Sequence, residues 1–146
     1  MLDDSTAPEP AISLEFQDSE VANITVDGTT VVVRFSAAHV HRHADGTDRD
    51  AGYLKSLELV CSGGAVLQQD QGCVGRISAG LLTVAGEPMK RVRIPFETIG
   101  DATLELAFTN GSRFHAKASG VVVRVAGGSR FLESFACCTV RRPAPP

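Results

Sequence analysis

The sequence predicts one all-β domain, mostly antiparallel, and three observations support this class. Apolar and polar residues alternate with a period of two through most of the chain, as expected of strands that bury one face. Turn signals rich in glycine, asparagine and aspartate recur at short intervals, and no segment of ordinary length has the spacing of an amphipathic helix. We expect about eight to ten short strands in a β-sandwich, with a closed or partly open β-barrel as the alternative.

The ends of the 146-residue chain differ in composition from its body. Residues 1–10 are acidic, residues 141–146 (RRPAPP) are rich in proline, and both are predicted to be tails around a single domain at residues 11–140. Seven of the 17 acids but none of the 14 bases precede Arg34. We therefore expect either a solvated acidic tail and edge strand, or an acidic segment that lies against a basic patch.

The first strands are predicted around a two-residue turn. Residues 11–16 alternate weakly, and residues 21–26 and 29–35 flank Asp27-Gly28, which favours a type I′ hairpin with Ile24 opposite Val31. Later strands are expected at residues 54–62, 73–78, 81–84, 90–96 and 120–125. The segment Phe131–Cys138 fits a strand and a helical turn equally well.

The best-defined hairpin lies at residues 101–118. A three-residue loop that ends at Gly111 pairs Leu106 with Phe114 and keeps the apolar residues on one face. A two-residue loop would instead pair Leu106 with His115 and mix the two faces. We therefore predict a type I turn with a bulge, in which Gly111 takes the left-handed conformation.

Two runs of three valines, residues 31–33 and 121–123, break the alternation. Strands that are apolar on both faces are usually buried on both sides. These runs predict either central strands under a second layer or strands at a subunit interface.

Three of the four histidines, His39, His41 and His43, lie within five residues directly after a predicted strand. If the strand continues, they project from one face about 6–7 Å apart, and imidazoles at alternate positions can share a zinc or iron ion. In the alternative, the strand ends and runs into a solvated loop, with Asp45-Gly46 and Asp48 making the turn. We expect no cofactor, with a divalent metal at this cluster as the alternative.

The histidine spacing resembles the His-x-His motif of cupins, which are double-stranded β-barrels, and Asp45 stands near the acid of that motif. The resemblance covers about seven residues. The glycine before the first histidine is missing, and no second motif with Pro, Gly and His occurs near residue 95. The properties of that family are therefore not carried over to this chain.

We expect structural roles for the other reactive side chains. The four cysteines, Cys61, Cys73, Cys137 and Cys138, have no Cys-x-x-Cys spacing and are expected to be reduced and mostly buried. The sequence contains no nucleophile elbow and no glycine-rich phosphate loop before a helix.

Two charged groups are expected on the surface. Glu105 and His115 should form an exposed cross-strand pair. Lys90, Arg91 and Arg93 form a basic stretch that is either a solvated face or a contact for an acidic segment, such as the N-terminal acids of the chain itself.

These observations predict a non-catalytic binding or interaction module of unknown ligand, with self-association to a homodimer through the valine strands. The alternatives are a metal- or small-molecule-binding β domain that uses His39, His41 and His43, and an accessory structural subunit of a larger assembly. No catalytic residue is predicted. The net charge of −3 argues against a nucleic-acid partner, and no apolar run is long enough to cross a bilayer. A cytoplasmic location is expected, because residues 1–10 carry no secretory signal.

Overall fold

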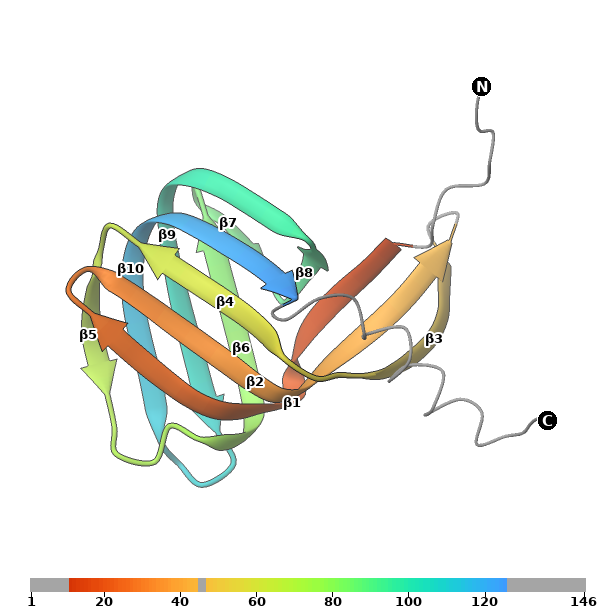
Figure 1. The fold of residues 1–146 in the computed structure, drawn as a ribbon, viewed down its shortest axis with the longest axis horizontal. Helices are drawn as coiled ribbons and strands as arrows, with labels where there is room; N and C mark the ends of the chain where they lie inside the picture. The colour runs from red at the N-terminus through yellow and green to blue at the C-terminus, as the bar shows by residue number, and fades with distance from the viewer. Residues whose placement is uncertain (1–10, 45–46, 126–146) are drawn as a thin grey trace.

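The computed structural model describes residues 11–44 and 47–125, which form ten β-strands and no helix (Figure 1). In chain order the strands are β1 (Ala11–Asp27), β2 (Thr30–Ala44), β3 (Thr47–Leu54), β4 (Leu57–Ser62), β5 (Ala65–Gln69), β6 (Gly75–Val84), β7 (Glu87–Met89), β8 (Arg91–Ile94), β9 (Phe96–Phe108) and β10 (Arg113–Val125). The predicted tails, Cys137, Cys138 and the segment 131–138 lie outside the described residues. None of the described residues belongs to a helix that could span a membrane.

Six strands form a closed antiparallel barrel. They follow the order β1-β2-β4-β10-β9-β6, and β6 pairs with β1 to complete the circle. The all-β antiparallel class is therefore confirmed, in the form of the barrel alternative and not of the sandwich expected first. The reason lies in β1, because this long strand pairs with β2 along one edge and with β6 and β8 along the other.

A bulge makes β1 one strand where the sequence predicts two. The ladder between β1 and β2 shifts register between Glu15 and Asn23, and Asp18 takes a positive φ of 72°. The buried side chain of Ser19 replaces the lost ladder bonds, since its Oγ donates to the carbonyl of Glu15 (2.6 Å) and accepts from the N–H of His39 (2.8 Å).

Beyond the bulge, the strands continue as an arm that we define as residues 11–16 of β1, residues 38–44 of β2, β3 and β8. In Figure 1 the first part of β1, the end of β2 and β3 extend to one side of the barrel. The arm pairs in the order β3-β2-β1-β8. One of its faces carries Leu14, Val40 and Val92, which are buried and belong to the same hydrophobic cluster as the barrel interior.

The barrel interior is filled by alternate residues of every long strand, as the period of two predicts. Together the barrel and the arm bury one hydrophobic cluster, whose largest fully buried side chains are those of Phe16, Phe114, Leu14, Leu54, Leu57, Leu59, Ile77, Leu82, Leu104, Val33 and Val40. Burying such side chains is the main stabilising term of the fold, at about 1.5–3 kcal/mol each.

The two predicted hairpins have different outcomes. The three-residue loop between β9 and β10 is confirmed, because Leu106 pairs with Phe114 and Gly111 has a φ of 92°. The predicted register between β1 and β2 is wrong by two residues, because Ile24 lies opposite Val33 and not opposite Val31. The two loop residues are Gly28 and Thr29, and Gly28 takes a positive φ. Asp27 lies in β1 instead, so it does not take the left-handed conformation that the predicted type I′ turn would require of it. A shift of two residues leaves every side chain on its predicted face.

The valine runs are buried on one side and half-buried on the other. Val31, Val33, Val121 and Val123 point into the core. The middle valines, Val32 and Val122, are only half-buried on the outer wall, so no second layer of the described residues covers them. The alternative, a subunit interface, stays a prediction. Both lie opposite Val60 of β4, so the three side chains form one outward row that we call the valine row.

Other boundaries moved by a few residues. The predicted strand 54–62 is split, because Ser56 takes a positive φ of 63° between β3 and β4. The predicted strands 73–78 and 81–84 merge into β6, and 120–125 continues the predicted hairpin strand within β10.

Candidate metal centre

The predicted histidine cluster lies on the arm, within a strand. β2 continues to Ala44 and pairs with β1 on one side and with β3 on the other. The three histidines therefore lie within the strand and not in a solvated loop, and Asp48 belongs to β3 and not to the turn. The predicted turn residues Asp45 and Gly46 lie outside the described residues. His39, His41 and His43 occupy alternate positions on the face opposite Val40.

The register between β1 and β2 brings an acidic residue to this face. Glu15 lies opposite His39, and the next position on its face, Ser13, lies opposite His41. Glu15, His39 and His41 each place one donor atom within 4.8 Å of the others. The Oε1 atom of Glu15 is 2.5 Å from Nε2 of His41 and 3.7 Å from Nδ1 of His39. These three side chains are hereafter called the Glu–His–His cluster.

His43 does not join this cluster. Its Nε2 atom is 2.7 Å from the Oγ of Ser13, which is buried. Alternate residues of a strand are about 6–7 Å apart, so His39 and His43 are about twice that distance apart along β2. Three histidines on one strand cannot surround one ion, and the third donor has to come from the neighbouring strand.

Backbone and ring contacts hold His39 in place. Its Nδ1 atom is 3.1 Å from the carbonyl oxygen of Gln17, and its ring stacks on that of Tyr53 at a centroid distance of 5.4 Å. When Nδ1–H donates to that carbonyl, the lone pair of the ring lies on Nε2 and can bind a metal. Metal-binding histidines are commonly oriented by such a contact.

A guanidinium group also faces the carboxylate of Glu15. Arg91 of β8 lies opposite Glu15 in the ladder, and its Nη2 atom is 3.8 Å from Oε1. Glu15 is one of the N-terminal acids, so this pair realises part of the predicted contact between the acidic segment and the basic stretch. It also means that a bound cation would share the carboxylate with a positive side chain.

The cluster is partly covered. The exposed fractions of the side chains are 24% for Glu15, 18% for His39 and 13% for His41. Electrostatic attraction between charged groups is stronger here than on an open surface, because fewer water molecules screen it. Each of the three side chains nonetheless keeps part of its surface exposed to solvent.

Comparison with family models, with curated proteins and with solved structures found no match for this chain.

The described cysteines offer no reactive centre. Cys61 and Cys73 are free and buried, as predicted. Burial raises the pKa of Cys61 to about 12 and also raises the pKa of Cys73. Both thiols therefore remain protonated at neutral pH. Because the thiolate and not the thiol is the nucleophile, neither cysteine is expected to react. The thiol of Cys73 donates to the carbonyl of Arg113, at 3.3 Å.

The predicted pair of Glu105 and His115 has the expected register but no bond. The two residues lie opposite one another on β9 and β10. No hydrogen bond or ion pair joins them within the part of the chain that the structure describes.

Sequence analysis missed Glu15 as a member of the site. Its distance from the histidines along the chain gives no signal, and the two-residue turn predicts a register that cannot be extended through the bulge. The usable signal was the alternation of residues 11–16, which places Ser13 and Glu15 on the polar face.

Proposed function

We propose that this chain is a non-catalytic β-barrel module whose arm binds a divalent transition-metal ion, with Zn²⁺ as the simplest case. The observation that carries the proposal is the convergence of Glu15, His39 and His41 from two strands. Imidazole nitrogens and carboxylate oxygens are the donors that Zn²⁺ accepts together.

The distances suit this chemistry after small adjustments. A tetrahedral zinc ion with bonds of about 2.0–2.2 Å needs its donor atoms about 3.3 Å apart. The Oε1 atom of Glu15 lies 2.5 Å from Nε2 of His41, closer than this value, and the three ligand atoms of the cluster lie within 4.8 Å of one another. Binding of an ion would require side-chain rotations that move Oε1 of Glu15 away from Nε2 of His41.

Such an ion would connect β1 to β2 next to the bulge. Its three protein donors leave at least one coordination position for water or for another ligand. A cytoplasmic location stays a prediction.

The first test is the mass of the native protein. Untagged protein purified without chelators or added metal should carry one metal ion per chain, and the double variant His39→Ala/His41→Ala should carry none. A wild-type chain of bare mass that also fails to bind added Zn²⁺ would contradict the proposal. Circular dichroism of the variant shows whether the fold survives the substitution.

We propose as a second candidate that the chain self-associates through the valine row. This is supported by the three half-buried valines of β2, β4 and β10 on the outer wall. They adjoin a charged row, in which Glu58 accepts from Arg34 and Arg124 at 3.1 Å. The role of an accessory subunit in a larger assembly stays a prediction.

Sedimentation analysis tests this second candidate. Wild-type protein should form a dimer, and Val60→Lys should be a monomer, because it places a charge at the centre of the row. The control is Ile99→Lys, at a side chain that is 90% exposed on β9. A monomeric wild-type protein at high concentration would overturn the proposal.

A further inference from the structure

The outer wall of the barrel has a hollow on the β5-β10-β9-β6 side. Its volume is about 300 Å³, which is at the lower end for pockets that bind small molecules. Ala79 of β6 and Ala107 of β9 both line it and lie directly opposite one another. Their small side chains leave the space that longer residues fill elsewhere on the wall.

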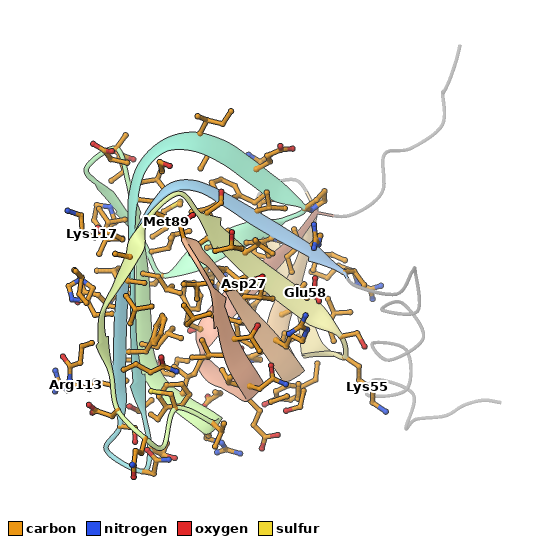
Figure 2. All side chains as sticks on the ribbon, turned by 60° about the vertical axis from the view of Figure 1, so that its left-hand side comes forward. Asp27, Lys55, Glu58, Met89, Arg113 and Lys117 are labelled. Carbon is orange, nitrogen blue, oxygen red and sulfur yellow. The ribbon has the colours of Figure 1, made fainter. Side chains whose placement is uncertain are left out.

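Polar residues surround the two alanines. The ladder places Gln68, His115, Glu105 and Leu81 in one row across the four strands, and all four line the hollow. Arg113 lies opposite Ala107 on the other side. Figure 2 shows the side chains of Arg113 and Lys117 on this wall, directed away from the barrel.

Positive charge prevails around the hollow. Lys90 and Arg113 line it, and among the lining residues only Glu105 is acidic. Within the described residues, neither cationic side chain has an ion pair, whereas Arg34 and Arg124 share Glu58. The nearby carboxylate of Asp70 accepts from the backbone N–H of Arg113 (2.9 Å) and from Gln68 (3.3 Å).

We propose that this hollow binds the oxyanion of a small ligand, a phosphate or a carboxylate group. Arginine presents several N–H donors in a plane that matches two oxygens of such a group, and Lys90 adds a second positive charge. Gln68 and His115 can contribute further hydrogen bonds. The site involves none of the Glu–His–His cluster, and so it is independent of the proposed metal.

The test is a pair of NMR titrations of ¹⁵N-labelled full-length protein, with sodium phosphate and with sodium acetate, at constant pH and ionic strength. We expect saturable shifts confined to amides of β5, β6, β9 and β10 around the hollow. Saturation by phosphate alone supports a phosphate-bearing ligand, and by acetate alone a carboxylate. Saturation by both supports an oxyanion site without further selectivity. The absence of saturation with either probe would overturn the proposal.

Three variants localise the effect. Arg113→Ala should raise the dissociation constant about tenfold or more, because it removes a charge-assisted contact. Lys117→Ala, on the same face of β10 but outside the hollow, should leave it unchanged. Glu105→Gln should lower it, and a partly unfolded protein could not mimic this gain in affinity. Equal effects of Arg113→Ala and Lys117→Ala would show that general surface charge explains the binding, and would contradict the site.

Discussion

At the scale of single residues, Ser19 shows how one hydroxyl group can hold a site together. It is buried in the bulge of β1 and bonds the carbonyl of Glu15 and the N–H of His39, so it fixes two members of the Glu–His–His cluster through their backbones. We expect Ser19→Ala to lower the free energy of unfolding by about 1–3 kcal/mol, because two covered backbone groups lose their partner. Ser36→Ala, at an exposed hydroxyl, should change it by less than about 0.5 kcal/mol. Urea denaturation of both variants checks this, and equal losses would be evidence against a bridging role.

The buried thiol of Cys61 predicts a dependence of stability on alkaline pH. Its pKa is about 12 in the folded protein against an ordinary value of 9.0. Above pH 9 the unfolded chain therefore loses a proton that the folded chain keeps, so the stabilisation that is complete below pH 9 declines towards pH 12. We expect the free energy of unfolding to fall less steeply with pH in Cys61→Ala than in the wild-type protein between pH 9 and 10.5. Identical slopes would show that Cys61 ionises normally in the folded state.

At the scale of elements, the β9–β10 hairpin follows from local rules. The loop length follows from the alternation, because only a three-residue loop keeps the apolar residues on one face. In this loop Gly111 adopts a φ of 92°. An added side chain would meet no atom within 4 Å, so the cost of replacing this glycine is conformational. We predict that Gly111→Ala destabilises the protein by about 1–2 kcal/mol and Gly111→Asn by less, because asparagine tolerates left-handed backbone better. Thermal unfolding measures both, and a stabilising Gly111→Ala would refute the turn assignment.

The bulge of β1 shows where local rules fail. Nothing in residues 17–20 specifies that the ladder with β2 should shift there, because the shift depends on Ser19 reaching the backbone of another strand. The sequence could therefore predict which residues face the same side of each strand, but not that Glu15 would meet His39.

The arm should respond as a unit to metal binding. If Glu15 and the two histidines share an ion, β1 and β2 are cross-linked beside the bulge, and opening of the arm becomes rarer. We expect added Zn²⁺ to slow hydrogen exchange of backbone amides in residues 11–16 and 38–43, with no change in the β9–β10 loop. Glu15→Gln should abolish the slowing. A uniform slowing over the whole chain would argue against a local site.

At the scale of the whole molecule, barrel closure needs β1 to pack tightly across β6. A Cβ atom at Gly80 would lie 2.5 Å from the Cβ of Phe16, so even alanine would push the two strands apart. We expect Gly80→Ala to destabilise the barrel by about 1–3 kcal/mol, as overpacked cores do. Ala79→Ser, at the exposed neighbouring position, should change stability by less than about 0.5 kcal/mol. Similar denaturation midpoints for the two variants would contradict this view of closure.

The sequence could not predict whether the strands form a sandwich or a barrel, for a related reason. Alternation in β6, β9 and β10 predicts one buried face per strand, and both architectures satisfy it. Closure is decided by the length of β1 and its bend at the bulge, and these are long-range properties. The same long strand positions Glu15 beside the two histidines, so closure of the barrel and the part played by Glu15 were unpredictable for one physical reason.

The most direct test of the proposed metal centre compares the Zn²⁺ affinities of Glu15→Gln and His43→Ala. Isothermal titration calorimetry of the metal-free proteins gives both values under the same conditions. Our account predicts that Glu15→Gln weakens binding at least about tenfold, as loss of a ligand does, whereas His43→Ala binds like the wild-type protein. Weak binding by His43→Ala together with unchanged binding by Glu15→Gln would show that the three histidines of β2 form the site, and would contradict the cluster described by the structure.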